Sequence, residues 1–354
     1  MTRLPPLARR SKTLSASLGL GEKLFASSEE RRFADAIETG LVEVEEGLLR
    51  EVSFADDMAD VTSRYLLEAG GKRIRPVLTL LTAQLGEGNN PSVITAAQAV
   101  EITHLASLYH DDVMDEAEMR RGVPSAQNVW GNSVAILTGD LLFARASKLV
   151  ASLGEGAIKL QADTFERLCL GQLHETIGPR IDDDPIEHYL GVLADKTGSL
   201  IAAAAQMGVV FSNAPEEFGP PVVAFGEKIG VAFQLIDDVI DLAEPETDTG
   251  KPQGTDLRSG VATLPLLFLR RAALTDADAA ALLARIELHV EVDGDETELA
   301  AAIADLRAHD VTTETLDEAR RWADEAVAAL APLPAGPVKL ALTKFAEAVV
   351  DRST

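Results

Sequence analysis

Two acidic motifs with the same internal spacing stand out in this sequence, DDVMD at residues 111–115 and DDVID at residues 237–241. If both segments are helical, the first and fifth carboxylates of each motif lie one turn apart on the same helix face. Two unit charges about 4 Å apart repel each other by ~4 kcal/mol at an effective dielectric constant of about 20. A bound cation relieves this repulsion, and Mg²⁺ commonly shares protein carboxylates with substrate phosphates. The two motifs therefore predict a diphosphate held between helices by metal ions.

The alternative is that these acids belong to solvated helix faces, as most acidic runs do. That explanation suits residues 276–305, where Asp and Glu are scattered among alanines. It suits the two motifs poorly, because each follows a mostly apolar stretch, AVEITHLASLYH at residues 99–110 and FGEKIGVAFQLI at residues 225–236. The pair of motifs therefore favours a functional site.

Two cationic segments could bind the anion. In GGKRIR at residues 70–75, two glycines let the backbone approach a ligand, and three cations lie at a predicted helix N-terminus, where anions are favoured. Arg120 and Arg121 follow the first motif; adjacent residues on a helix point in different directions, so the two arginines could serve two phosphate groups. The alternatives are a solvated loop for the first segment and surface ion pairs with Glu116 and Glu118 for the second.

Further polar residues could also contact a bound diphosphate. Lys196-Thr197-Gly198 interrupts a predicted helix, and Lys251 follows the second motif in a glycine-rich loop. His104 lies seven residues before Asp111, on about the same helix face, where it suits a hydrogen bond to an anion beside the metal site. A core histidine with satisfied hydrogen bonds is the alternative. The pair His110-Asp111 resembles the signature of metal-dependent HD phosphohydrolases, but we do not find the further His and Asp ligands of that family.

Composition limits the possible partners. The chain has 354 residues, 46% of them hydrophobic, and a formal charge of −25, which argues against nucleic acid or an anionic membrane surface. The only cysteine, Cys169, excludes an internal disulfide framework, fits a reducing cytoplasm and is expected to be a small buried residue. No segment resembles a signal peptide or a membrane span. We therefore expect a soluble cytoplasmic protein, although its product need not be soluble.

Helical periodicity covers nearly the whole chain, and strand signals are nearly absent. We expect helices at residues 29–53, 57–68, 76–85, 91–115, 132–152, 157–178, 185–211, 216–243 and 261–272, then shorter ones at 274–351. Clusters of helix breakers, such as Gly70-Gly71 and GEGNN at residues 86–90, lie between these segments. This pattern predicts a single all-α catalytic domain over residues 29–354, preceded by a mobile tail over residues 1–28.

The order of the motifs resembles that of the trans-isoprenyl diphosphate synthases, or polyprenyl synthetases, over residues 30–350. The matching landmarks are GGKRIRP at 70–76, the first aspartate motif running into MRRG at 119–122, KTG at 196–198, FQLIDDVIDL at 233–242, GKPQGTDL at 250–257 and TLP at 263–265. The resemblance implies an all-α isoprenoid synthase-type helical bundle around a deep central cavity, usually in a homodimer. It also implies a Mg²⁺-dependent prenyltransferase of isoprenoid biosynthesis, which joins isopentenyl diphosphate head-to-tail to an allylic diphosphate.

Carried over to matching positions, the resemblance assigns roles to residues of this chain. Direct Mg²⁺ ligands would be Asp111, Asp115 and Asp237, with water-mediated contacts from Asp112, Asp238 and Asp241. Isopentenyl diphosphate would contact Lys72, Arg75, His104 and Arg121, and the allylic diphosphate would contact Arg120, Lys196 and Lys251. Thr197 and Gln234 would lie near the reacting carbons and, with Arg120 and Lys196, act in catalysis. Three Mg²⁺ ions per substrate-bound site are implied. Many relatives carry Lys where this chain has Val261, so one contact to the allylic diphosphate is in doubt.

The residues before the first motif bear on product length. One helical turn rises 5.4 Å, comparable with one extended isoprene unit. Ala106 and Ser107 precede Asp111 by five and four residues, where short-product relatives place a bulky aromatic side chain, and Thr103 further down is also modest in size. Small side chains let a growing tail pass, which predicts a product of about seven to ten isoprene units, C35–C50. The alternative is that they only permit close helix packing, and that another helix limits the product to farnesyl or geranylgeranyl diphosphate.

Other activities fit parts of the pattern. A terpene cyclase or a head-to-head condensing enzyme shares the metal motifs but does not need the second diphosphate site at residues 70–75. A non-catalytic partner subunit, which only shapes the cavity of an active chain, would carry degraded aspartate motifs, and both motifs are intact here. A metal-dependent phosphohydrolase would release phosphate without making a longer lipid.

Overall fold

The computed structural model describes residues 28–243, 253–291 and 296–351. These residues form two compact units. Unit 1 is drawn from Met1–Phe165, Leu200–Val223 and Pro332–Leu342, and unit 2 from Glu166–Ser199, Ala224–Ala331 and Thr343–Thr354. The predicted tail lies outside the described residues apart from Ser28, and the single catalytic domain over residues 29–354 stays a prediction.

Unit 1 is built mainly from the N-terminal helices and one short hairpin. Its elements are α2 (Ser28–Glu51), α3 (Asp57–Glu68), α4 (Ile74–Ala83), α5 (Pro91–Met114), β1 (Met119–Arg120), β2 (Val123–Pro124), α6 (Ala126–Trp130) and α7 (Asn132–Leu153). Parts of α8 (Glu155–Ile177), α10 (Ser199–Phe211), η2 (Glu216–Phe218), α11 (Gly219–Asp241) and α17 (Pro337–Val350) complete it.

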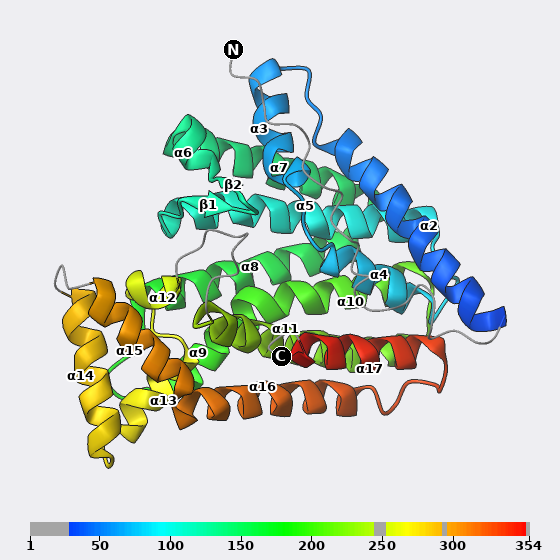
Figure 1. Cartoon of the computed structure of the whole chain (residues 1–354). Helices are drawn as coiled ribbons and strands as arrows, with labels where there is room; N and C mark the ends of the chain where they lie inside the picture. The colour runs from blue at the N-terminus through cyan, green and yellow to red at the C-terminus, as the bar shows by residue number, and fades with distance from the viewer. Residues whose placement is uncertain (1–27, 244–252, 292–295, 352–354) are drawn as a thin grey trace. The chain divides into compact units, whose positions relative to one another are not determined.

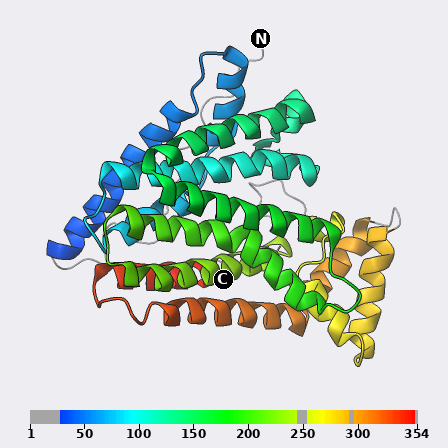
Figure 2. The ribbon, with the colours of Figure 1, turned by 180° about the vertical axis from the view of Figure 1, so that it is seen from behind.

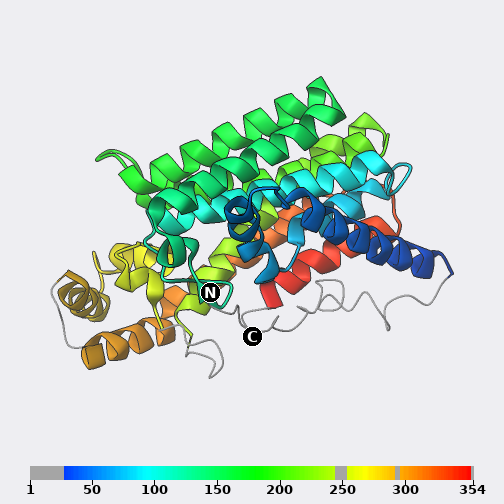
Figure 3. The same cartoon turned by 90° about the horizontal axis from the view of Figure 1, so that it is seen from above.

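Helix α5 carries the first aspartate motif and is fixed at both its start and its sides. The Asn90 side chain accepts hydrogen bonds from the backbone N–H groups of Ser92 and Val93, and Pro91 occupies the first turn. Helices α5 and α7 lie side by side (Figure 1), and α2 packs against α4 and α5 (Figure 3). Because these neighbours enclose α5, most of its apolar residues, such as Ile102, are buried. The motif at its C-terminal end therefore starts from a rigid support.

Unit 2 holds the second motif. Besides its parts of α8, α11 and α17, it contains α9 (Pro185–Leu193), η1 (Ala194–Gly198), α12 (Thr255–Arg258), α13 (Leu264–Ala272), α14 (Ala277–Glu291), α15 (Glu296–Ala308) and α16 (Asp310–Ala329). Helices α14 and α15 lie side by side, and α13 contacts both α14 and α16 (Figure 2). Leu235 and Ile236, directly before the second motif, join Leu264 and Ile303 in the apolar core of this unit. Apolar packing therefore anchors the end of α11 immediately before its carboxylates.

The all-α prediction is confirmed, and the long helices begin and end within a few residues of the predicted positions. Three details differ. The segment 185–211 is two α-helices joined by a π-helical turn, and residues 119–124, which lie between two expected helices, form a hairpin of two short strands. Cys169, expected to be buried, is exposed. No helix among the described residues is both long and apolar enough to cross a membrane.

Candidate active site

The first aspartate motif lies at the C-terminal end of α5. Asp111 is partly exposed in the last turn, and Asp115 caps the helix and is exposed. The backbone N–H of Asp115 donates to the carbonyl of Asp111 at 2.8 Å, so helical spacing continues to the fifth position. The two carboxylates therefore lie one turn apart, as predicted, at the negative end of a helix dipole. Both the mutual repulsion and the dipole favour a cation here.

The second residue of this motif has a different environment. Asp112 is 0% exposed, and its Oδ1 accepts a hydrogen bond from Arg120 Nε at 2.6 Å, while its Oδ2 has no hydrogen-bond partner. Burial raises the pKa of Asp112, although the guanidinium of Arg120 opposes the shift. Asp112 thus holds Arg120 against α5. Among the described residues this ion pair replaces the surface pairs with Glu116 or Glu118 that were the alternative.

Arg120 and Arg121 sit on a hairpin, so the helical geometry from which their different directions were predicted does not apply there. Arg121 and Gly122 form the two-residue loop between β1 and β2, with φ values of 55° and 76°, as a type I′ turn requires. The usual Asn-Gly signal for such a turn is absent from the sequence. The two arginines nevertheless diverge as predicted, since Arg120 contacts Asp112 and Arg121 Nη1 donates to the carbonyl of Leu66 at 2.7 Å.

Four arginines surround His104, which is partly exposed on α5. Burial lowers the pKa of His104 well below its usual value, and Arg75, Arg121, Arg120 and Arg73 lower it further. The imidazole is therefore neutral at physiological pH, and the excess positive charge around it favours an anion. His104 thus lies among cations, seven residues before Asp111, and its predicted hydrogen bond to an anion stays a prediction.

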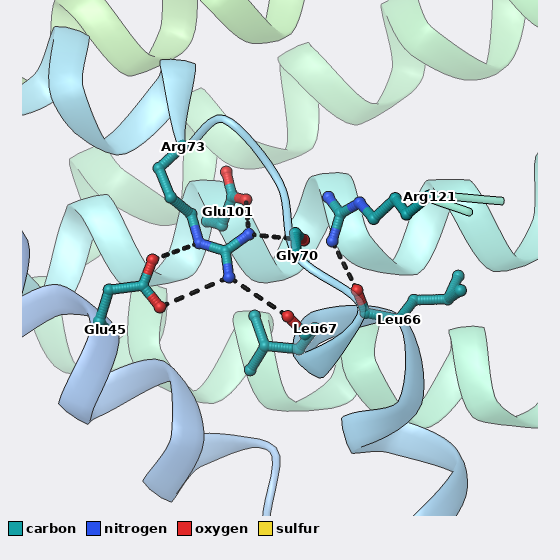
Figure 4. Close-up of polar contacts among 7 residues, drawn as sticks. All are labelled: Glu45, Leu66, Leu67, Gly70, Arg73, Glu101 and Arg121. Atoms are coloured by element: carbon teal, nitrogen blue, oxygen red, sulfur yellow. Dashed lines mark hydrogen bonds and ion pairs between the residues drawn. The ribbon is translucent and has the colours of Figure 1, made fainter. Parts of the chain in front are cut away.

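The loop before α4 contributes the cations on one side of this cluster, part of which is shown in Figure 4. Lys72 is exposed, and Arg75 is partly exposed with no hydrogen-bond partner at its Nε. Burial lowers the pKa of Arg75 to about 10, with Arg121 acting in the same direction and Glu101 opposing it. Arg73, in contrast, is buried and turned toward carboxylates. The structure thus separates Lys72 and Arg75, which are exposed or partly exposed, from Arg73, which is buried.

The second aspartate motif repeats this arrangement in unit 2. Asp237 and Asp241 are partly exposed and one turn apart at the C-terminal end of α11, and Gln234 lies nearly one turn earlier on the same face. Asp238 is 1% exposed; its Oδ2 accepts from the Tyr189 hydroxyl at 2.6 Å, and its Oδ1 has no hydrogen-bond partner. Burial raises the pKa of Asp238 to about 8, although the hydrogen bond from Tyr189 lowers it.

The chain after the second motif returns to it. The Asp241 carboxylate accepts a hydrogen bond from the backbone N–H of Asp256 at 3.1 Å, and its carbonyl accepts one from Gly254 at 2.8 Å. Val261, whose N–H donates to the carbonyl of Asp256, is 40% exposed. Lys251 lies outside the described residues. The predicted contacts of this loop with the allylic diphosphate therefore stay predictions.

Lys196 and Thr197 lie in a π-helical turn, a feature frequent at functional sites. Both are partly exposed, and Lys196 Nζ forms an ion pair with Glu175 at 2.5 Å. The turn lies close to α8, because a Cβ added at Gly171 would lie 2.8 Å from the Lys196 nitrogen. Arg167 also braces it by donating from Nε to Asp195 at 2.9 Å. The helix interruption that the sequence indicated is thus a π-helical turn held by side-chain contacts.

The three residues predicted to set chain length are buried on α5. Ala106, Ser107 and Thr103 are 0%, 6% and 4% exposed, and the Ser107 hydroxyl donates to the carbonyl of His104. A growing chain that passes beside them must therefore displace the side chains that now cover them. Their role in product length stays a prediction.

The donor set of the two motifs fits a hard divalent cation, since every candidate ligand is a carboxylate oxygen. The fit is supported by the exposure of Asp111, Asp115, Asp237 and Asp241 at helix ends. Within the ranges that the structure describes, no three acidic, histidine or cysteine side chains are already grouped closely enough to hold a metal ion.

Comparison with known proteins decides the family. The sequence profile of the polyprenyl synthetases matches residues 57–304. The chain belongs to the polyprenyl synthetase family. The resemblance inferred from the ordered motifs is thereby confirmed, and with it the prenyltransferase class and the isoprenoid synthase helical fold.

Three members of the family illustrate the likeness. The chain is 42% identical over 345 residues to a nonaprenyl diphosphate synthase of Mycobacterium tuberculosis, covering 97% of this chain and 99% of the relative. A crystal structure of a polyprenyl synthase from Caulobacter crescentus, complexed with calcium and isoprenyl diphosphate, superposes with a TM-score of 0.82 at 31% identity, covering 92% and 98%. A geranylgeranyl pyrophosphate synthase from Corynebacterium glutamicum, with the same ligands, has a TM-score of 0.77 at 40% identity, covering 94% and 99%.

Several polar residues at these sites were missed by sequence reasoning. They are the buried or cross-element partners of predicted residues: Glu45, Glu101, Arg167, Glu175 and Tyr189. Only Glu101 carried a sequence signal, as an acid within the apolar stretch before the first motif. Each of the others depends on a contact with another helix that the local pattern does not contain.

The lowered pKa of His104 gives a test of its environment. Because the folded protein resists protonating His104 while the unfolded chain protonates it near pH 6.5, the unfolded state binds more protons below that pH. Stability should therefore fall as pH decreases through 6.5, and His104→Gln should remove this part of the loss. We expect the melting temperature to fall less between pH 7 and pH 5 in His104→Gln than in the unchanged protein. Parallel curves would contradict the assigned environment.

Proposed function

We propose that this chain condenses isopentenyl diphosphate with an allylic diphosphate, head-to-tail and in trans geometry, to make a long-chain polyprenyl diphosphate. The observation that carries the proposal is the cationic cluster around His104 in the same unit as an intact aspartate motif. A second diphosphate site is needed by a condensing enzyme that uses isopentenyl diphosphate, and not by a cyclase or a phosphohydrolase. The high identity to a nonaprenyl diphosphate synthase supports the same assignment.

Isopentenyl diphosphate is proposed to bind at the N-terminal end of α4. Lys72 approaches it from the loop, Arg75 from the first turn of α4, and Arg121 from the hairpin turn. The neutral imidazole of His104 donates a hydrogen bond to a diphosphate oxygen. Since these residues belong to one unit and surround one region of excess positive charge, they can bind a single anion together.

The allylic diphosphate is proposed to bind through metal ions held by the aspartate motifs, with Arg120, Lys196 and Lys251 as its cationic contacts. Asp111, Asp115 and Asp237 would hold Mg²⁺ shared with the phosphates, and Asp112, Asp238 and Asp241 would support them through water or neighbouring side chains. Bound Mg²⁺, three ions in the substrate complex, would supply electrostatic stabilisation of the leaving diphosphate.

The residues of the chain then orient the two carbon atoms that join. Thr197 and Gln234, partly exposed in the π-helical turn and before the second motif, are proposed to face the allylic carbon after its bond to the diphosphate breaks. The alkene of isopentenyl diphosphate attacks that carbon, and the released diphosphate accepts the proton lost. The chain needs no dedicated base for this step.

A long product of about C35–C50 is supported by the small side chains of Ala106, Ser107 and Thr103 and by the nonaprenyl relative. A shorter product is the second candidate, favoured by two observations: the three side chains are buried, and a geranylgeranyl pyrophosphate synthase is 40% identical.

We also propose that the protein is a homodimer and works in the cytoplasm. Ile136, Leu137 and Leu141 on α7 are 42%, 60% and 39% exposed, and such an apolar face suits a second copy. The single cysteine suits a reducing compartment.

The test of the function is incubation of the purified chain with Mg²⁺, labelled isopentenyl diphosphate and allylic diphosphates of increasing length, followed by sizing of the product. We expect label in a chain of about seven to ten isoprene units, and no product when a chelator removes the metal. Failure to elongate any primer would reject the proposal. Release of phosphate without a longer lipid would instead support a phosphohydrolase.

A further inference from the structure

Arg73, the middle cation of the GGKRIR loop, has its whole hydrogen-bonding capacity in use. Its Nε and Nη2 donate to the two carboxylate oxygens of Glu45 at 2.5 and 3.4 Å (Figure 4). Its Nη1 donates to Glu101 at 3.3 Å and to the carbonyl of Gly70 at 3.1 Å, and its Nη2 also donates to the carbonyl of Leu67 at 3.3 Å. An arginine offers five N–H donors, and these contacts account for five. Arg73 therefore has no donor left for a substrate.

The backbone at Arg73 is held in an uncommon conformation. Arg73 caps the start of α4 with φ at 53°, in the left-handed region that non-glycine residues rarely adopt. Its side chain is only 7% exposed and joins four elements: α2 through Glu45, the end of α3, α5 through Glu101, and α4 itself. Lys72 and Arg75 lie one and two residues away. The anchoring of Arg73 consequently fixes the loop that carries Lys72 and the first turn of α4, which carries Arg75.

Arg73 also determines the space available to Arg121. A Cβ added at Gly71 would lie 2.4 Å from Arg73 Nη1 and 3.0 Å from Arg121 Cζ, so the glycine lies between the two guanidinium groups. Arg121 donates to the carbonyl of Leu66 and Arg73 to that of Leu67, consecutive carbonyls at the end of α3 (Figure 4). Carbonyls at a helix C-terminus lack partners within the helix and favour cations. A displaced Arg73 would leave Arg121 free to shift.

We call the group formed by Glu45, Arg73 and Glu101 the clamp. Its charges distinguish two possible effects on a diphosphate: positioning of the neighbouring cations, and direct electrostatic attraction. Burial lowers the pKa of Arg73, but Glu101 and Glu45 more than offset it, so the pKa is raised. Two carboxylates thus surround one guanidinium, and the clamp adds negative rather than positive charge beside an anion site. On charge alone, removing a carboxylate would strengthen the binding of a diphosphate. If the carboxylate positions the cations, its removal would weaken binding.

We propose that Glu45, acting through Arg73, is a positioning residue for the isopentenyl diphosphate site, and that Glu101 completes the clamp from α5. The inference rests on the proposed function, because it takes Lys72, Arg75 and Arg121 as the groups that bind this diphosphate. Glu45 and Arg73 themselves do not touch the substrate.

The test compares Glu45→Gln with Glu46→Gln. Both changes remove one negative charge from neighbouring positions of α2, but Glu46 is exposed and has no part in the clamp. In Glu45→Gln, an amide NH₂ replaces one acceptor opposite the guanidinium. We expect the Kd of isopentenyl diphosphate, measured by calorimetry without an allylic substrate, to rise about tenfold in Glu45→Gln and to stay within about twofold in Glu46→Gln.

The kinetic pattern separates positioning from general damage. We expect KM for isopentenyl diphosphate to rise with Kd in Glu45→Gln, while KM for the allylic diphosphate and kcat change little. Arg73→Lys should likewise raise KM for isopentenyl diphosphate. Unchanged or tighter binding of isopentenyl diphosphate by Glu45→Gln would overturn the inference. The inference would also be overturned if the affinities for both substrates fell equally and the melting temperature of Glu45→Gln fell with them. If the unchanged protein binds isopentenyl diphosphate but does not elongate a primer, the proposed function fails, while the binding comparison still decides the role of Glu45.

Discussion

Asp111→Asn and Asp237→Asn should each lower kcat by about three orders of magnitude. A metal ion contributes several kcal/mol to the stabilisation of charge on a departing phosphate, and each 1.36 kcal/mol corresponds to about a tenfold change in rate. Asparagine keeps the size and an oxygen of aspartate but removes the charge, so the loss reports the metal rather than packing. Product formation under saturating substrates, measured over a range of Mg²⁺ concentrations, checks the expectation.

Two comparisons sharpen this measurement. Asp35→Asn, an exposed acid on α2, makes the same chemical change far along the sequence from either motif and should leave kcat and the Mg²⁺ requirement unchanged. If the aspartates ligate metal, the residual activity of the two variants should require a higher Mg²⁺ concentration for half-maximal rate. Near-normal turnover by either variant at limiting Mg²⁺ would remove that residue from the metal site.

The helices were predictable because apolar residues recur at helical spacing and clusters of breakers, such as Gly70-Gly71, separate the segments. The hairpin that carries Arg120 and Arg121 was not, because its type I′ turn is formed by Arg121-Gly122 and lacks the common Asn-Gly signal. The position of the helix interruption at Lys196-Thr197-Gly198 could be predicted from the local sequence. The hydrogen bond from Arg167 to Asp195, which supports this turn, could not. Local patterns predict elements, whereas side-chain partners depend on how those elements pack.

The aspartate motifs show the same division. The first and fifth acids of each motif were expected on one face and are partly or fully exposed at a helix end. The second acid is turned by about 100° from the first, toward the packed side of its helix. Asp112 and Asp238 are accordingly buried and bound to Arg120 and Tyr189. That rotation could be computed from sequence, but the partners could not.

The three cations of the GGKRIR segment are not equivalent in the structure. Composition treats Lys72, Arg73 and Arg75 as three equivalent cations beside an anion. In the structure, Arg73 forms ion pairs with Glu45 and Glu101, which lie 28 residues before and after it in the chain. The charge available to a ligand is therefore smaller than the loop sequence suggests, and its placement is more strictly controlled. The metal geometry, the role of Lys251 and the product length stay predictions.

Ala106→Phe should shorten the product from about seven to ten isoprene units to about four or fewer. Ala106 lies five residues before Asp111, so a chain that grows along α5 from the metal site meets an aromatic ring within about one or two turns. Ala106 is fully buried, and an inserted ring also costs about 1–3 kcal/mol through overpacking. We therefore expect a lower melting temperature together with a shorter product, sized by chromatography after removal of the diphosphate.

Ala97→Phe separates the two effects of this substitution. Ala97 is also 0% exposed, and nine residues at 100° per residue place it on the opposite face of α5 from Ala106. It should lower the melting temperature without shortening the product. The corresponding Leu variants impose less strain and keep the comparison possible where a Phe variant does not fold. If both Ala106 variants retain the product distribution of the unchanged protein, this face of α5 does not limit the chain. The floor of the product cavity must then be formed by another element.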